Sequence, residues 1–362
     1  MDISAFRAQF PVFDRMEYLN TGTAGPVPRR AIELATDRLT NEVLPRGRTG
    51  EAHWARLQEL REELRLAYAR LLGCTPDEVA LTYSSGDGLG AVLLGFDFRP
   101  GDEILTSDEE HVGLLGPLGL VRDSRGVQLR VAPFDTLADA VGPRTRMIAC
   151  SHVSWVTGKI VDVPALVSHG LPVLLDGAQS LGAIQVDVRA LGCDYFAAPG
   201  QKWLCGPDGT GCLYVRQDRI ESLPPTRANY FTLREPMLAP DLVFNDGARR
   251  FDLGVPQGAL VLWCLEALRV LEAPGWAWVL ERGPTLAQRL AQQLADAGVR
   301  VAPRGQSTLV TFEHADAGRR VVELFDEGFA LRDIPGRPLV RASVGAWSSE
   351  AALDQLVDRI VQ

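Results

Sequence analysis

Seven short apolar runs in the first 215 residues limit most strongly how this chain can fold. They are Glu78–Tyr83, Glu103–Thr106, Gln128–Ala132, Met147–Cys150, Val173–Leu175, Tyr195–Ala198 and Gly211–Val215. Most are separated by lengths that suit crossover connections, which is typical of parallel strands covered on both faces by helices. The last two runs are close together, which leaves room for one antiparallel edge. We therefore predict an α/β fold with a mostly parallel seven-stranded sheet.

The rest of the chain follows a different pattern. Helical periodicity is present in residues 56–72, and after the last run in Ala259–Leu271, Thr285–Ala297 and Ser349–Val361. A weaker strand pair, Thr308–Glu313 and Val340–Val344, precedes the final helix. These segments predict a small α+β domain. We expect a large domain over residues 15–255 and a small domain formed by residues 1–14 and 256–362.

The composition excludes several classes of protein. The 362 residues are 46% hydrophobic and 23% charged, which is ordinary for a globular protein with a sizeable core. A net charge of −9 argues against nucleic acid as the main partner. The sequence has no run of about 18 apolar residues for a membrane span, and its N-terminal segment lacks the features of a secretory signal. We expect a cytoplasmic enzyme.

The six cysteines, at positions 74, 150, 193, 205, 212 and 264, form no C-x-x-C pair and no zinc spacing with a histidine pair. Most have apolar neighbours, so we interpret them as buried, reduced thiols. A catalytic cysteine is the alternative, and only Cys205 lies near the segment of greatest interest. We expect no metal site.

Lysine is almost absent from this chain: Lys159 and Lys202 are the only two among 37 basic residues. Lys202 lies in AAPGQKWLCGPDGTG, an apolar, glycine-rich stretch that follows a predicted strand. A desolvated lysine is nucleophilic toward carbonyl groups, whereas a guanidinium cannot form a Schiff base. We infer that this position needs an amine rather than a charge. Lys159, in TGKIVDV, is interpreted as a solvated turn residue.

Ligands of open α/β sheets bind at the carboxyl ends of the strands, and Ser84, His111, Asp176 and Lys202 each follow a predicted strand closely. The carboxylate of Asp176, within VLLDGAQSLG, is costly in an apolar segment unless it has a partner. It either caps a helix or faces a positive ring or metal. His111 either stacks on a planar cofactor or is a polar loop residue.

Ser84–Gly90 precedes a helix-like segment, and its small residues leave backbone N–H groups free for a phosphate. The same stretch, GDGLGA, fits a dinucleotide fingerprint with Asp108 about 20 residues on, so a nicotinamide-dependent oxidoreductase is a rival interpretation. Arg341 either binds a substrate carboxylate or forms a surface ion pair. Together these residues meet the needs of pyridoxal phosphate: a Schiff-base lysine, a carboxylate for the ring nitrogen, a phosphate cradle and a stacking group.

From residues 18–31 to residues 340–360 the chain resembles the class V aminotransferases of the fold-type I pyridoxal phosphate enzymes. The strongest segment is residues 176–215, with D-x-A-Q, the lysine and a G-P-x-G-x-G turn. That family includes cysteine desulfurases, isopenicillin N epimerase-like proteins and the C–S lyases of ergothioneine synthesis. The resemblance implies a fold-type I architecture, bound pyridoxal phosphate, an amino acid substrate and a homodimer with sites near the dimer interface.

The resemblance also implies a role for each candidate residue. The expected roles are the internal aldimine and proton shuttle for Lys202, the ring nitrogen partner for Asp176, the ring hydroxyl contact for Gln179, the phosphate contacts for Ser85 and Gly86, ring stacking for His111 and the substrate carboxylate clamp for Arg341. We also expect Trp155 and Arg332 to shape the substrate pocket.

Several positions depart from the family pattern. Pro199-Gly200-Gln201 stands where Ser-Gly-His is frequent, so Gln201 replaces the histidine only in part. Gly254-Val255 stands in place of Gly-Thr, and Trp155 in place of the desulfurase asparagine. These departures predict weaker cofactor binding, or compensation by other groups.

Residues 314–340 contain no cysteine, although desulfurases carry their nucleophilic cysteine on that loop. We therefore expect an enzyme that acts at the Cα of an amino acid without a protein persulfide. An aminotransferase is expected first, with a C–S lyase, an epimerase and a non-catalytic binding relative as alternatives.

Overall fold

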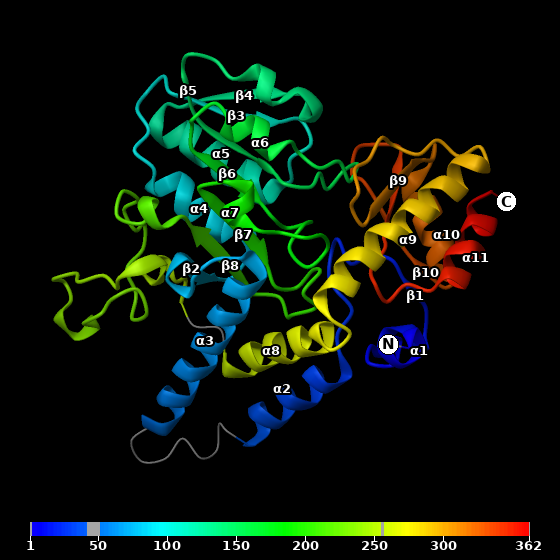
Figure 1. Cartoon of the computed structure of the whole chain (residues 1–362), viewed down its shortest axis with the longest axis horizontal. Helices are drawn as coiled ribbons and strands as arrows, with labels where there is room; N and C mark the ends of the chain where they lie inside the picture. The colour runs from blue at the N-terminus through cyan, green and yellow to red at the C-terminus, as the bar shows by residue number, and fades with distance from the viewer. Residues whose placement is uncertain (1, 42–50, 255–256, 362) are drawn as a thin grey trace.

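The computed structural model describes residues 2–41, 51–254 and 257–361. Within them, seven strands form one sheet in the order β2-β8-β7-β6-β5-β3-β4 (Figure 1). The strands are β2 (Val79–Thr82), β3 (Glu103–Ser107), β4 (Gln128–Ala132), β5 (Thr145–Ser151), β6 (Val173–Asp176), β7 (Tyr195–Pro199) and β8 (Gly211–Val215). Each predicted run forms a strand, and the α/β fold class is confirmed.

Two details of the sheet differ from the prediction. The antiparallel strand is β8, which lies inside the sheet and pairs antiparallel with both β7 and β2, so β2 is the edge strand. At the other edge, three of the five residues of β4 are exposed, although a buried strand was expected. The reason is that β4 is an edge strand, with a neighbouring strand on one side only.

Helices cover both faces of the sheet. On one face lie α3 (Glu51–Leu72), α6 (Val163–Val167), α7 (Val188–Leu191) and α8 (Gly258–Glu272), and on the other α4 (Ser85–Gly95) and α5 (Val112–Arg125). Leu57, Leu60 and Leu64 recur at helical spacing on α3 and are buried, as the periodicity predicts. Helix α8, which the prediction assigns to the small domain, packs on both sides of the boundary. Leu265 belongs to the core of the large domain, whereas Leu271 packs in a cluster with Phe6 and Trp347.

The small domain has a three-stranded antiparallel sheet in the order β11-β12-β9, as the strand pair predicts. Its elements are β9 (Leu309–Glu313), β11 (Arg332–Asp333), β12 (Leu339–Ser343), and the helices α9 (Trp276–Asp296), α10 (Ala317–Asp326) and α11 (Glu350–Val361). Helix α9 starts nine residues before the predicted Thr285 because it continues through Pro284.

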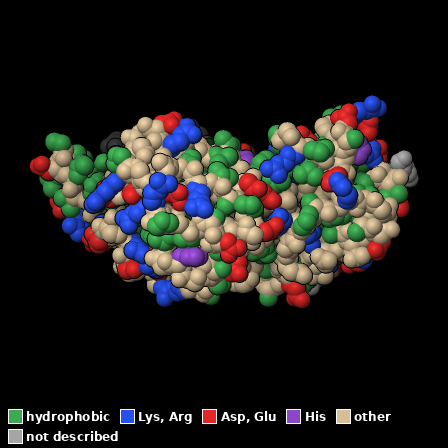
Figure 2. All heavy atoms as spheres, turned by 90° about the horizontal axis from the view of Figure 1, so that it is seen from above, with side chains coloured by type: hydrophobic (Ala, Val, Ile, Leu, Met, Phe, Trp, Pro, Cys, Tyr) green, Lys and Arg blue, Asp and Glu red, His purple; other side chains and the backbone are tan. Residues whose placement is uncertain are grey.

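The N-terminal segment joins the small domain. After α1 (Ile3–Arg7), β1 (Glu17–Tyr18) pairs with β10 (Phe329–Ala330), and the chain then leads to α2 (Arg29–Asn41). Small-domain contacts therefore extend beyond the expected boundary at residue 14, while the boundary at residues 255 and 256 lies outside the described residues. None of the helices of the described chain has the length and apolar character needed to cross a membrane. Acidic and basic side chains are interspersed on the face seen in Figure 2.

Candidate active site

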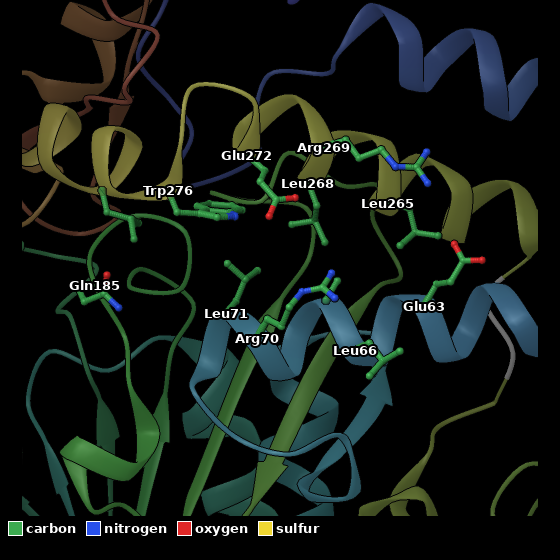
Figure 3. A pocket seen from close by; sticks show the side chains of 12 residues that line it. Glu63, Leu66, Arg70, Leu71, Gln185, Leu265, Leu268, Arg269, Glu272 and Trp276 are labelled. Carbon is green, nitrogen blue, oxygen red and sulfur yellow. The ribbon is translucent and has the colours of Figure 1, made fainter. Parts of the chain in front are cut away.

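Two hollows of similar size differ in what lines them. A groove of about 340 Å³ between α3 and α8 is lined by leucines and Trp276, with charged side chains such as Arg70 and Glu272 around them (Figure 3). A cavity of about 290 Å³ lies at the carboxyl edge of the parallel sheet. Seven of the predicted site residues line the cavity: Ser85, Gly86, His111, Asp176, Gln179, Gln201 and Lys202. The cavity is therefore the candidate active site. None of the residues that line the cavity also lines the groove.

Lys202 and Asp176 are placed by neighbouring strands, since Asp176 ends β6 and pairs in register with Ala197 of β7. Burial lowers the pKa of Lys202 to about 8, while Asp176 opposes the shift and the guanidiniums of Arg341 and Arg332 add to it. Asp176 is buried and accepts the N–H of Ala178 at 2.9 Å. Burial raises its pKa, and Lys202 opposes that rise. The strand ends thus set a nucleophilic amine near a carboxylate that has no salt-bridge partner within 4 Å among the described residues.

Gln179 lies in the cavity wall with its amide already engaged. Its Nε2 donates to the carbonyl of Gly22 at 2.8 Å, and its Oε1 accepts from Nε1 of Trp203 at 3.0 Å. Among the described residues, these two bonds leave the second hydrogen of Nε2 and the second lone pair of Oε1 for a ligand. The expected contact with a ring hydroxyl stays a prediction, and the structure adds a second task, which is to hold the loop that contains Gly22.

The first turn of α4 forms a possible anion cradle. Ser84 is the N-cap residue, and its hydroxyl accepts from the N–H of Asp87 at 3.1 Å. The N–H groups of Ser85 and Gly86 have no acceptor among the described residues, so they are free for a phosphate. The GDGLGA stretch lies inside α4 rather than in a turn before it, and Asp108 accepts from the N–H of Phe134 instead of facing the cavity. The dinucleotide fingerprint is therefore not formed.

His111 is the N-cap residue of α5, and its Nδ1 accepts from the N–H of Gly113 at 3.1 Å. Burial lowers its pKa to about 4, helped by the positive charges of Lys202 and Arg332. The ring is therefore neutral at physiological pH, and its edge contacts Trp155 with ring centroids 5.0 Å apart. A neutral, fixed imidazole suits stacking on a planar ligand.

Arg341 is fully buried beside the cavity, so the interpretation of a surface ion pair is wrong. Its Nη1 donates to the carbonyl of Trp155 at 2.6 Å, whereas Nε and Nη2 are buried without a partner. Burial lowers its pKa to about 9. Arg332, which is opposite Arg341 in the β11–β12 register, lines the cavity and donates to the hydroxyl of Thr23 at 3.0 Å. Arg332 therefore lines the cavity itself, whereas the predicted Arg341 is not among its lining residues and lies behind Gly22.

The loop around Gly22 and Thr23 was quoted only as part of the resemblance, yet both residues line the cavity. A Cβ added to Gly22 would lie 2.8 Å from Nη2 of Arg341, so a side chain there is excluded without a shift. In the sequence, the two glycines of TGTAGP, residues 21–26, were the signal that could have identified this loop as part of the site. Lys159 is not solvated as expected: its Nζ lies 2.5 Å from Asp135, and 18% of its side chain is exposed.

The cysteines supply no side chain to the lining of the cavity as it is described. Five of the six are buried and Cys74 is partly buried. Cys205, the nearest in sequence to Lys202, has a pKa raised well above its usual value by burial. A catalytic thiol is therefore not present in this cavity.

The cavity residues fit pyridoxal phosphate. The free N–H groups of the α4 N-terminus suit its phosphate, Asp176 suits a protonated ring nitrogen, and the neutral ring of His111 suits its planar face. The Oε1 atom of Gln201 is buried without a partner, and Pro199 supplies no hydroxyl. The third departure, Val255, lies outside the described residues.

Comparisons with known proteins agree with this fit. A family model described as Aminotransferase class-V matches residues 18–333. A probable cysteine desulfurase of Mycolicibacterium paratuberculosis is 27% identical over 358 residues, which cover 91% of this chain and 52% of the relative. A probable cysteine desulfurase of Methanothermobacter thermautotrophicus is 31% identical over 260 residues, covering 68% of this chain and 64% of the relative. The chain therefore spans about half the length of the first of these relatives and two thirds of the second.

Solved structures resemble the whole chain. C-DES, described as a cystine C–S lyase in complex with its reaction product cysteine persulfide, has a TM-score of 0.89 and 26% identity, covering 98% of this chain and 99% of its own. A lysine-to-alanine mutant of C-DES, with glycine covalently linked to the PLP cofactor, has a TM-score of 0.91 at the same identity and coverage. The cysteine desulfurase CsdA of Escherichia coli has a TM-score of 0.86 and 25% identity, covering 99% of this chain and 98% of its own.

Proposed function

Because the chain belongs to the class-V aminotransferase family and is a pyridoxal phosphate enzyme, we propose that it is a C–S lyase that acts on a disulfide amino acid such as cystine. The sequence favours an aminotransferase first and a lyase as the alternative. The proposal takes the lyase, because the relatives are named for carbon–sulfur chemistry and the cavity has no thiol. Aminotransferase activity stays a prediction for the assay below.

The missing thiol is the observation that carries the proposal. A desulfurase passes sulfur to a cysteine of its own, whereas residues 314–340 contain none and none of the six cysteines lines the cavity as described. Sulfur then leaves with the substrate's own leaving group, as sulfide from cysteine or as a persulfide from a disulfide. The disulfide substrate is proposed because Arg332 suits a second carboxylate, as argued below. The product named for C-DES is a persulfide of this kind.

The two guanidiniums support a substrate with two carboxylates. Arg341 retains two unpartnered nitrogens, which suit bidentate binding of the carboxylate next to Cα. Arg332 lines the cavity, donates to Thr23 and to the carbonyl of Asp333, and lies over the ring of Trp155 at 5.7 Å. Its Nη2 has no acceptor among the described residues, which suits a carboxylate farther from Cα. Cystine carries such a second carboxylate, and cysteine does not.

When bound, pyridoxal phosphate supplies an electron sink for negative charge that develops at the substrate Cα. Lys202, whose pKa is lowered to about 8, holds the cofactor and then takes the proton from Cα. Asp176 keeps the ring nitrogen protonated. His111 is neutral, so it stacks without competing for that proton. Ser85 and Gly86 bind the phosphate through their N–H groups.

The net reaction balances without an oxidant. The Cα–H bond and one Cβ–S bond of cystine break, and the sulfur leaves with the electron pair as cysteine persulfide. The remaining three-carbon unit takes up one water molecule and becomes pyruvate and ammonia.

The decisive experiment incubates the holoprotein with L-cystine and measures pyruvate, ammonia and alkylated persulfide. We expect the three in equal amounts. A keto acid formed only with an added keto acid acceptor, and without ammonia, would show an aminotransferase instead. A D-amino acid product would show an epimerase. A holoprotein that converts none of the amino acids tested would show the non-catalytic relative.

Arg332→Gln provides the matched test of the substrate class. Loss of a hydrogen bond to a charged group corresponds to roughly a 10- to 100-fold rise in KM for cystine. S-methylcysteine has a single carboxylate, so its KM should barely change. An equal rise in KM for both substrates would show that Arg332 does not bind a second substrate carboxylate.

A further inference from the structure

The segment of residues 154–159, here named the coupling loop, joins the large domain to the small domain beside the cavity. Three of its carbonyl groups accept hydrogen bonds from the small domain. The carbonyl of Trp155 accepts from Arg341 at 2.6 Å, that of Val156 from the hydroxyl of Thr311 at 2.6 Å, and that of Gly158 from the hydroxyl of Ser307 at 2.6 Å. The loop therefore fixes the small-domain sheet, including the guanidinium of Arg341.

Glu109 holds the opposite side of the coupling loop. Its Oε2 accepts from the hydroxyl of Ser154 and from that of Thr157, the latter at 2.7 Å. Ser154 in turn accepts from the N–H groups of Val156 and Thr157, both at 3.1 Å. Only 7% of Glu109 is exposed. One buried carboxylate thus organises the turn whose carbonyls face the small domain.

The turn that carries Glu109 also carries His111. Glu110, between them, accepts from the N–H of Ser151 at 2.9 Å and from its hydroxyl at 2.6 Å, and Ser151 pairs with Asp176 in the sheet. Glu110 therefore ties this turn to the sheet, and Glu109 ties it to the coupling loop. The ring of His111 meets the ring of Trp155 at 5.0 Å as a result.

We propose that Glu109 is a positioning residue for the substrate carboxylate: it holds the coupling loop so that the carbonyl of Trp155 orients Arg341 toward the cavity. The carbonyl of Trp155 is the only acceptor for Arg341 in the described residues. Without it, the guanidinium has no contact that selects one rotation, and its two free nitrogens lose their fixed direction. Ser154 and Thr157 donate to Glu109, and Nζ of Lys159, at the end of the loop, lies 3.6 Å from its Oε1. The shape of the loop therefore depends on this carboxylate.

The proposal rests on the proposed function only in taking Arg341 as the carboxylate-binding group. Its test uses glycine and methylamine, two primary amines that differ by a carboxylate. Binding of each to the holoprotein is followed through the absorbance of the bound cofactor. Neither probe has a leaving group, so the test does not depend on C–S cleavage. Failure of the lyase assay with a positive result here would reject the function and keep the positioning role.

We expect Glu109→Ala to lose about tenfold or more of the preference for glycine over methylamine, because one charge-assisted contact loses its geometry. Glu109→Gln should restore most of the preference, since an amide oxygen accepts from the same hydroxyls. Glu221→Ala is the control. It removes the exposed partner of Arg250 and leaves the contacts of Glu109 with the coupling loop in place, so the preference should be unchanged.

Equal weakening of both amines by Glu109→Ala, or an unchanged preference in a folded variant with normal cofactor affinity, would overturn the proposal. If Glu109→Ala does not fold, the double variant Ser154→Ala and Thr157→Val removes the two donors instead. It must show the same loss of preference, and a retained preference would again overturn the proposal.

Discussion

Two buried groups of arginines and carboxylates show how charge is used differently in this molecule. In the first, Arg61, Arg65 and Asp252 are each about 1% exposed. Asp252 accepts from Arg61 at 2.6 Å, from Arg65 at 2.8 and 3.0 Å, and from the N–H of Leu81 at 2.8 Å. Among the described residues, Nε of Arg61 is the one nitrogen of these two guanidiniums that is buried without a partner, and that guanidinium lies over the ring of Phe231 at 4.2 Å. This group joins α3 to β2 and to the loop that reaches Gly254.

The second group lies at the cavity, and its charges are not balanced within the protein. Arg341 keeps two buried nitrogens without partners, and burial lowers the pKa of both Arg341 and Lys202. A buried charge is costly unless it is paired, so such groups are retained where a ligand completes them. The comparison teaches that paired buried charges stabilise the scaffold, and unpaired ones mark the site.

The largest expected effect tests the chemistry of the second group. Lys202→Arg keeps a positive charge but removes the amine. We expect activity to fall by at least about 10²–10⁴-fold, from lost proton transfer alone, and the absorbance band of covalently held cofactor to disappear. Borohydride treatment followed by mass spectrometry should find cofactor attached to Lys202 in the native protein only. A variant that still shows a reducible band would assign the covalent role elsewhere.

The next effect tests the first group. Asp252→Ala leaves two buried guanidiniums without their carboxylate, which should lower the free energy of unfolding by about 3–5 kcal/mol. Denaturant unfolding measures the loss. Arg300→Ala, which breaks an exposed pair with Glu313, is the control and should cost at most about 1 kcal/mol. Equal losses in the two variants would contradict the assignment of the buried group to the scaffold.

A smaller effect concerns pH. Only the unprotonated amine of Lys202 can attach the cofactor, and its pKa of about 8 lies below that of an ordinary lysine. The rate at which apoprotein takes up pyridoxal phosphate should therefore rise about fivefold from pH 7 to pH 8 and level off above about pH 9. Stopped-flow absorbance gives the rate. A rate that keeps rising tenfold per unit to pH 10 would show a normal lysine.

The smallest effect is expected in the groove between α3 and α8, although it is as large as the cavity (Figure 3). Arg70 is exposed there, so Arg70→Ala should change kcat/KM by less than about twofold and stability by at most about 0.5 kcal/mol. Steady-state kinetics and thermal unfolding check both. A large loss of activity would give the groove a part in function.

The homodimer that the resemblance implies also stays a prediction, and sedimentation of the holoprotein tests it. The described chain supplies both domains and every named cavity residue, whereas Val255, where the family's threonine contacts the neighbouring subunit, lies outside the described residues.

The fold and the central site were readable in the sequence for physical reasons. Apolar runs without alternation predict strands buried on both faces, and their carboxyl ends must meet at one edge, which is why Ser85, His111, Asp176 and Lys202 come together. The rarity of lysine identified Lys202 without any structure. Local periodicity also predicted α3, α8, α9 and α11, although it placed the start of α9 nine residues late, and it did not predict α2, α5 or α10.

Only the tertiary structure decided the rest, because pairing and burial join residues that are far apart in the chain. Nothing local shows that β8 lies inside the sheet, or that Lys159 is paired rather than solvated. The burial of Arg341 follows from the packing of β12 against the loop at Gly22, and its hydrogen bond to Trp155 spans 186 positions. The sequence thus determined which groups are available for chemistry, and the packing of the two domains decided which of them remain without a partner.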